Sequence, residues 1–300
     1  MKFSDNLLAS LLMMAAMAGL TLNDAFLKSM SGQVPLYQLL FLRGVFTALA
    51  VAVIAWRMRA FSYRIARRDW GFIAIRTATE VTAAYFFMTA LFNMPLANVV
   101  AIMQAVPLTI TLAAALFLKE PLGWRRMSAI IVGFVGVLLI VRPGSEGFNA
   151  YSLYCLGAVV CVTLRDLSTR RLSREVPSLM VTLVATIAVM VAFGTASLTQ
   201  DWQPMDTREW GLLLTASVFA IGAYLSSIMA MRIGEISFVS PFRYTALIWG
   251  LILGWLMFGD WPAPIVLLGA AIVAGSGVFT LYREARLRRR TPKPADLHGR

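Results

Sequence analysis

The sequence contains few charged residues. Asp, Glu, Lys and Arg make up 14% of the 300 residues, whereas hydrophobic residues make up 59%. A soluble domain is typically about a quarter charged, so this chain has too few polar side chains to cover a surface in contact with water. The low charge therefore excludes an ordinary soluble protein and favours one embedded in a lipid bilayer.

Histidine and cysteine are also scarce. The single histidine, His298, lies in a polar C-terminal segment, and the two cysteines, Cys155 and Cys161, share one apolar run but fall on different helical faces. This usage excludes histidine-based catalysis in the apolar runs and argues against a disulfide framework or a metal site built from these ligands. We therefore expect no metal and no cofactor.

Motifs of several other membrane protein classes are missing. The sequence has no Walker motif, so ATP drive within this chain is excluded, and no segment like the TVGYG filter of potassium channels. The "GSG" at 275–277 could suggest a serine nucleophile, but no histidine lies in an apolar run to activate it. An intramembrane enzyme remains a less favoured alternative.

Apolar residues occur in long runs that charges, prolines and glycines separate. About 20 apolar residues cross the hydrocarbon core as a helix, and this criterion gives ten expected helices. Their approximate ranges are 7–27, 36–56, 70–91, 96–118, 126–142, 150–169, 178–198, 210–231, 236–258 and 263–283. We predict an all-α polytopic membrane protein with ten transmembrane helices.

Positive charge collects on alternate connections between the expected helices. The segments 57–69, 119–126 and 170–177 and the tail after 283 are basic, whereas the intervening connections are short, neutral or acidic. Because Lys and Arg accumulate on cytoplasmic loops, both termini are expected in the cytoplasm. The net charge of +12 then reflects topology, with contact to anionic lipids as an addition, and needs no nucleic acid partner.

The sequence repeats itself at low similarity. "TLND" at 21–24 returns as "TLRD" at 163–166, and Glu120, which ends an apolar run before a proline, returns as Asp260. Each half then holds five helices, an odd number, so the second half must enter the membrane from the opposite side. We predict an inverted-topology repeat with halves at 1–143 and 149–284 and a basic cytoplasmic tail at 285–300. Residues 1–22 could also pass for a signal peptide, but the repeat gives them a counterpart.

The stretch "FLKEPLGWRRMSAIIVGFVGVLLIV" at 117–141, its weaker echo at 256–281 and the five-plus-five layout resemble the drug/metabolite transporter superfamily, EamA type. The second copy departs from the pattern with Asp260 in place of the usual Glu. The resemblance implies a secondary transporter of small molecules in a bacterial inner membrane, working by alternating access. Aromatic amino acid exporters look most similar, which implies export of aromatic or other neutral amino acids. Purines, cationic compounds and other metabolites or drugs are the alternative substrates.

Glycines suggest where helices pack closely. Gly133 and Gly136 lie in the last helix of the first half, and Gly269, Gly275 and Gly277 lie in the last helix of the second. Small residues let helices approach one another in lipid, so these glycines predict close contacts. "GLILG" at 250–254 is a GxxxG that indicates packing within the chain or between protomers. We expect a monomer or a weak homo-oligomer.

Ionisable side chains inside the expected helices are candidate substrate contacts, because a charge in the bilayer core is costly unless it faces a partner or water. Arg76 and Glu80 lie four residues apart, hence on one helix face, with Tyr85 further along. The two charges could bind the carboxylate and ammonium groups of a substrate. Alternatively they neutralise each other, or Arg76 reaches the cytoplasmic surface.

Two expected helices contain proline and should be interrupted. Pro107 lies in the fourth helix of the first half and Pro241 in the fourth helix of the second. A proline removes a backbone hydrogen bond and frees a carbonyl. Interrupted helices in corresponding positions of both halves point to a binding site.

Four polar residues on the interrupted helices are further candidates. Gln104, Arg243 and Tyr244 are expected substrate contacts. Asn98 is another, although an interhelical hydrogen bond would also explain it. Arg243 could instead form a structural pair with a carboxylate such as Glu80.

The aspartates of the repeated tetrapeptide map to opposite faces of the membrane. Asp24 lies four residues before Lys28, and Asp166 lies beside Arg165. One interpretation is an interfacial ion pair in each half. The other makes Asp24, Asp166 and Arg165 parts of two alternating gates, paired when their side is closed. Either way, the substrate is expected about midway between the two aspartates.

Overall fold

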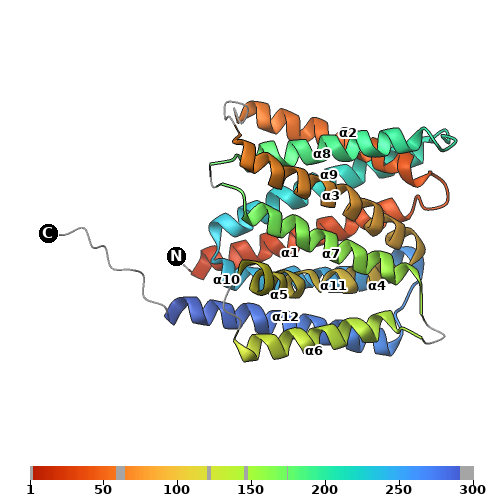
Figure 1. The fold of residues 1–300 in the computed structure, drawn as a ribbon. Coiled ribbons are helices and arrows are strands. Elements are labelled where there is room, and N and C mark those ends of the chain that lie inside the picture. The colour runs from red at the N-terminus through yellow and green to blue at the C-terminus, as the bar shows by residue number, and fades with distance from the viewer. Residues whose placement is uncertain (1–2, 59–64, 120–122, 145–147, 174, 291–300) are drawn as a thin grey trace.

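The computed structural model describes residues 3–58, 65–119, 123–144, 148–173 and 175–290, over which all regular structure is helical (Figure 1). The helices are α1 Phe3–Lys28, α2 Leu36–Arg57, α3 Arg67–Asn93, α4 Leu96–Met103, α5 Val106–Leu118, α6 Trp124–Val141, α7 Tyr151–Arg170, α8 Ser178–Ser197, α9 Thr207–Ile233, α10 Ile236–Val239, the 3-10 helix η2 Ser240–Thr245, α11 Ala246–Phe258 and α12 Pro264–Arg290. Glu120 and tail residues 291–300 lie outside the described ranges, so the predictions that concern them are not tested.

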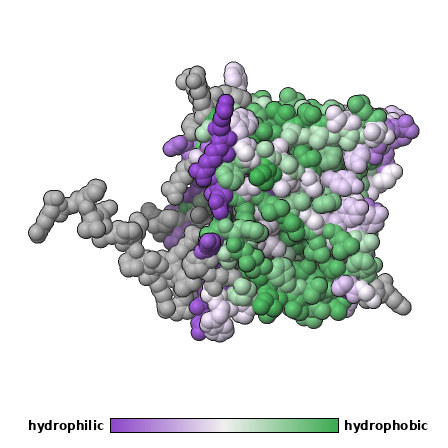
Figure 2. Space-filling view, viewed as in Figure 1, coloured by the Kyte–Doolittle hydropathy of each residue, from purple (hydrophilic) through white to green (hydrophobic). Residues whose placement is uncertain are grey.

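Each of the ten ranges expected from the sequence is helical. Within the described residues, nine spans are long and apolar enough to cross a membrane. Helix α3 is not among them, because its charged residues, including Arg76 and Glu80, lower its mean hydropathy. The fold is that of a polytopic helical membrane protein, and the tenth span stays a prediction. On the face seen in Figure 2, hydrophobic side chains form a band with hydrophilic side chains toward both ends.

The two predicted interruptions are confirmed. Helix α4 ends at Met103, and α5 restarts at Val106 with Pro107 in its first turn. In the second half, α10 gives way to η2, which contains Pro241, before α11 begins. Proline lacks an amide hydrogen and its ring clashes with the carbonyl four residues back. Proline therefore favours a break or a kink at both positions, and here the helices break.

The helices pack mainly in pairs. The most extensive contacts join α1 to α9, α2 to α8, α3 to α7 and α6 to α12, while α4 packs against α11. The start of α1 and the end of α12 lie at the same end of the bundle (Figure 1). We call this the Arg57 end, since α2 also finishes there. The opposite, Lys28 end is where α1 and α3 finish and α4 and α7 begin.

Buried hydrophobic side chains are distributed unevenly between the two ends. The largest cluster includes side chains of α1, α2, α3, α4 and α7 near the Lys28 end, such as Leu27, Leu39, Leu91 and Leu96. Near the Arg57 end there are two smaller, separate clusters, one around Met13 and the other around Ile73. The packing is thus more continuous at the Lys28 end.

Four of the five glycines predicted to pack closely do so. A Cβ on Gly136 would lie 2.8 Å from the Gly269 carbonyl oxygen, and one on Gly269 would lie 2.6 Å from that of Gly136. Gly133 faces Leu108 and Ser276, and Gly277 faces Tyr244. Gly275 is the exception, because a Cβ added there would have no atom within 4 Å. Residues two apart project from nearly opposite sides of a helix, so Gly275 and Gly277 cannot share one contact face.

The GxxxG of α11 packs within the chain. A Cβ on Gly250 would meet the Val100 side chain at 3.2 Å, and one on Gly254 would lie 3.8 Å from the Ala97 nitrogen. Both contacts are made with α4. The motif therefore joins the two interrupted helices. This contact within the chain accounts for the motif without an interface between protomers.

Candidate functional site

Helices α3 and α7 run antiparallel and carry polar contacts along their whole length. Asp69 and Ser173 meet at the Arg57 end, and Asn93 and Asn149 meet at the Lys28 end. The charged residues lie between these contacts, in the middle of the pair. Polar contacts near both ends of α3 and α7 therefore fix the two helices side by side, with the charged residues between these contacts.

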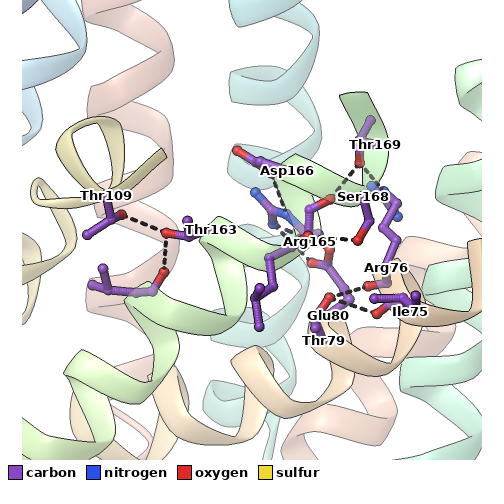
Figure 3. Close-up of polar contacts among 12 residues, drawn as sticks. Ile75, Arg76, Thr79, Glu80, Thr109, Thr163, Arg165, Asp166, Ser168 and Thr169 are labelled. Atoms are coloured by element: carbon purple, nitrogen blue, oxygen red, sulfur yellow. Dashed lines mark hydrogen bonds and ion pairs between the residues drawn. The ribbon is translucent and has the colours of Figure 1, made fainter. Parts of the chain in front are cut away.

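Arg165 joins two carboxylates at the centre of this pair (Figure 3). Its Nη1 lies 3.3 Å from Oε2 of Glu80, and its Nε donates to Oδ1 of Asp166 at 2.8 Å. The Arg165 side chain is 27% exposed, that of Glu80 30% and that of Asp166 36%. The cluster is thus partly open rather than sealed, which a transported molecule would require.

Arg76 has hydrogen-bonding capacity left over. Its Nε donates to Thr169 Oγ1 at 3.1 Å, but its Nη1 is buried and has no hydrogen-bond partner among the described residues. Glu80, the partner suggested by the four-residue spacing, instead forms its ion pair with Arg165 and attracts Arg76 over a longer range. A buried guanidinium donor without an acceptor is costly, so this atom is suited to bind an anionic group of a ligand.

The charged groups continue into α1 and α2. Arg43 interacts electrostatically with both Asp24 and Glu80, and Asn23 donates to Asp24 Oδ1 at 2.9 Å. Charges of alternating sign therefore connect four helices in the order Asp24, Arg43, Glu80, Arg165 and Asp166. The aspartates of the repeated tetrapeptide are the two ends of this series, and Glu80 lies between them.

One of the two expected ion pairs is present, and its place at a membrane interface stays a prediction. Arg165 and Asp166 are paired, as that interpretation requires. In the first half, Lys28 donates to the carbonyl oxygens of Leu91 at 2.9 Å and Met94 at 2.7 Å, at the end of α3, and Arg43 is the cation that acts on Asp24. Carbonyl groups at a helix C-terminus lack intrahelical partners and attract cations. Lys28 therefore binds the end of α3 instead of Asp24. A gating role of Asp24, Asp166 and Arg165 stays a prediction.

The interrupted helices are bonded to each other where they break. Gln104, at the end of α4, donates from Nε2 to the carbonyl oxygen of Arg243 at 3.1 Å. Tyr244 is buried against Gly277, and its hydroxyl has no hydrogen-bond partner in the described part of the chain. The same holds for the buried Oδ1 of Asn98. The Arg243 side chain is exposed. Glu80, which could have paired with Arg243, forms its ion pair with Arg165.

Tyr85 belongs to an aromatic cluster on the Lys28 side of the charges. Its ring centroid lies 6.2 Å from that of Tyr37, 5.8 Å from that of Phe86 and 6.3 Å from that of Tyr154. Tyr37 in turn stacks on Phe193 at 6.1 Å. These rings come from α2, α3, α7 and α8. Tyr37, Tyr154 and Phe193 have no sequence signal of their own, since isolated aromatics in apolar helices are common.

Several hydroxyl groups were also not foreseen. Thr109 on α5 and Thr163 on α7 share a hydrogen bond of 2.6 Å, and Thr169 receives the Arg76 bond (Figure 3). Thr163 is the first residue of the second tetrapeptide, but the repeat led to no prediction for its hydroxyl. The bond ties an interrupted helix to the charged pair of helices.

Comparison with known proteins places this geometry in a family. The model of the EamA-like transporter family matches residues 7–142 and again residues 149–282. A riboflavin transporter of Vibrio cholerae is 30% identical over 81% of this chain and 83% of its own length. An S-adenosylmethionine uptake transporter of Rickettsia conorii is 26% identical over 64% of this chain and 65% of its own length. A pseudopaline exporter of Pseudomonas aeruginosa is 23% identical over 89% of this chain and 94% of its own length.

A solved crystal structure has the same fold, with a TM-score of 0.63 at 18% sequence identity, covering 94% of this chain and 99% of its own. The relatives are bacterial transporters of varied small molecules, and none of the three just named is an amino acid exporter. The broader resemblance is confirmed, and the narrower one, to aromatic amino acid exporters, stays a prediction. The chain belongs to the EamA-like transporter family.

Proposed function

We propose that the protein is a secondary transporter that exports zwitterionic metabolites, neutral and aromatic amino acids among them, across the bacterial inner membrane. The observation that carries this proposal is the partly exposed charged cluster, in which Arg76 has a free buried donor and Glu80 and Asp166 share one arginine. A zwitterion brings a carboxylate for Arg76 and an ammonium group for a carboxylate of the cluster. Ionisable groups placed within membrane helices are characteristic of substrate pathways.

The proposal includes alternating access between two inverted halves, at 1–143 and 149–284. Two asparagines support the relation. Asn6, in the first turns of α1, accepts from the Glu235 amide at 2.9 Å just after α9, and Asn149, just before α7, donates to the Asn93 carbonyl at 3.1 Å. Asn6 and Asn149 occupy corresponding places in the two halves, as do Asn93 and Glu235. The first contact lies at the Arg57 end of the bundle and the second at the Lys28 end. Exchange of two inverted halves would turn each contact into the other.

The pairing of the helices follows the same rule. Exchange of the halves turns the pair α1 and α9 into α7 and α3, and it turns α2 with α8 and α6 with α12 into themselves. The ends of the bundle support cytoplasmic termini, since exposed arginines such as Arg57, Arg67 and Arg232 gather at the end where α1 starts.

A second candidate substrate is a flat heteroaromatic metabolite of the riboflavin type. The relative from Vibrio cholerae and the aromatic cluster around Tyr37 and Tyr85 favour it, because aromatic side chains stack on flat rings. Riboflavin carries no carboxylate, so it offers the Arg76 donor only neutral carbonyl and hydroxyl oxygens and gains less from the arginine charge. The two candidates are therefore separated by their need for Arg76.

Transport by the purified protein in liposomes tests the proposed function. Tryptophan, phenylalanine, threonine, methionine, adenine, riboflavin and S-adenosylmethionine are supplied on either side without nucleotide. We expect counterflow of at least one zwitterionic amino acid. If none of these compounds moves and the protein shows hydrolytic activity instead, the proposal is wrong and an intramembrane enzyme takes its place.

Replacing Arg76 with glutamine tests the assigned contact. Loss of a charge-assisted hydrogen bond of about 1.5–3 kcal/mol should raise KM for tryptophan roughly tenfold to a hundredfold, with little change for riboflavin or for tryptamine, which lacks the carboxylate. Arg68→Gln, a charge loss at an exposed position on the same helix, serves as the control. If Arg76→Gln raises KM equally for tryptophan and tryptamine, Arg76 does not bind the substrate carboxylate.

Replacing Gln104 with leucine should slow transport by up to about tenfold, because the bond between the two helix interruptions is lost and a neutral hydrogen bond contributes about 0.5–1.5 kcal/mol. Thr111→Val is the matched control, since the Thr111 hydroxyl bonds only within its own helix, to Pro107. Initial rates in liposomes measure both variants. Unchanged transport by Gln104→Leu would show that the link between the interruptions does not matter for function.

A further inference from the structure

A cavity of about 370 Å³ lies outside the proposed transport path, between α6 and α12. Arg125, Phe279, Tyr282 and Arg283 line it. These residues come from the first turn of α6 and the second half of α12, so the cavity opens at the Arg57 end of the bundle. Its volume falls in the lower part of the range for small-ligand sites.

The lining combines two positive charges with an apolar surface. Arg125 and Arg283 contribute guanidinium groups, which bind phosphate through paired hydrogen bonds. Phe279 is 46% exposed and Tyr282 62% exposed, on the side of the helix pair that faces away from the rest of the bundle. A ligand that fits must carry a negative headgroup and an adjacent hydrocarbon part.

The surroundings place the cavity at a membrane surface. Trp124 is 74% exposed, and the Arg125 guanidinium lies 5.2 Å from the centroid of its ring. Trp and Tyr gather at the level of lipid headgroups, and the stacking holds Arg125 at that level. Helix α6 also begins here, and its N-cap, Gly123, gives its first amide groups no side-chain acceptor, which favours an anion.

We propose that this cavity binds the phosphate of one anionic phospholipid, such as phosphatidylglycerol. Arg125 and Arg283 hold the phosphate, Tyr282 lies beside it at the headgroup level, and the acyl chains extend along Phe279 and the outer face of α6. The lipid then bridges the last helices of the two predicted halves, α6 and α12.

The test uses the full-length protein in nanodiscs of phosphatidylcholine with a small fraction of phosphatidylglycerol, and counts retained lipids by native mass spectrometry. We expect one phosphatidylglycerol to stay bound, and about a hundredfold weaker retention in Arg125→Gln/Arg283→Gln, since each lost hydrogen bond between a guanidinium and the phosphate contributes about a factor of ten or more. The control Arg57→Gln/Arg232→Gln removes the same charge from exposed positions at the same end and should retain the lipid.

Equal loss in both double variants would overturn the proposal, because it would show a diffuse charge effect. Inorganic phosphate is titrated in discs of phosphatidylcholine alone. Saturable binding there that depends on Arg125 and Arg283 would assign the cavity to free phosphate and also overturn the lipid assignment. Binding of phosphatidylglycerol that free phosphate does not displace supports it.

Discussion

Arg165→Gln is expected to reduce transport by about fivefold to a hundredfold. Arg165 is the cation that holds both Glu80 and Asp166, at 3.3 and 2.8 Å. Removing one partner of a fully buried pair costs about 3–5 kcal/mol, and the partial exposure of these side chains lowers this to roughly 1–3 kcal/mol. Each 1.4 kcal/mol corresponds to a factor of ten. Initial rates of substrate counterflow in liposomes measure the loss of transport in Arg165→Gln.

A double-mutant cycle separates the ion pair from a general loss of charge. In Glu80→Gln/Arg165→Gln the uncompensated carboxylate at position 80 is removed, so this variant should melt no earlier in detergent than Arg165→Gln alone. Arg67→Gln, at an exposed position at the start of α3, should transport normally. If Arg165→Gln itself works at the parental rate, the cluster is structural and the substrate is bound elsewhere.

The helices and their interruptions could be predicted from the sequence, because both depend on local chemistry. Runs of apolar residues indicated the ten ranges, and Pro107 and Pro241 determined where two helices break. Arg76 and Glu80 were correctly assigned to one helix face by their spacing. Each of these inferences needs only one segment of the chain at a time.

The partners of the charged residues could not be predicted in this way. Glu80 pairs with Arg165 rather than with Arg76, and Lys28 bonds to the end of α3 rather than to Asp24. Both outcomes depend on which helices lie side by side and in what register. A local spacing of four residues offers one partner, but a neighbouring helix can offer a better acceptor or a stronger charge.

The crossing of α6 and α12 leaves little room for larger side chains. Gly136→Ala or Gly269→Ala would place a methyl group 2.8 or 2.6 Å from the carbonyl oxygen of the other glycine. These are backbone atoms, which cannot rotate away as a side chain would, so the two helices must separate along their length. We expect each substitution to destabilise the protein by roughly 1–3 kcal/mol and to lower its melting temperature in detergent, measured by size-exclusion chromatography after heating.

Gly275→Ala on the same helix should act in the opposite direction. No atom lies within 4 Å of its added methyl group, and alanine favours a helix over glycine by about 1 kcal/mol. The same chemical change is thus expected to lower the melting temperature at position 269 and to leave it unchanged or raise it at 275. If all three alanine variants melt together, the close approach of α6 and α12 does not contribute to stability. If only the Gly136 and Gly269 variants melt early, this glycine contact is what holds the last helices of the two predicted halves together.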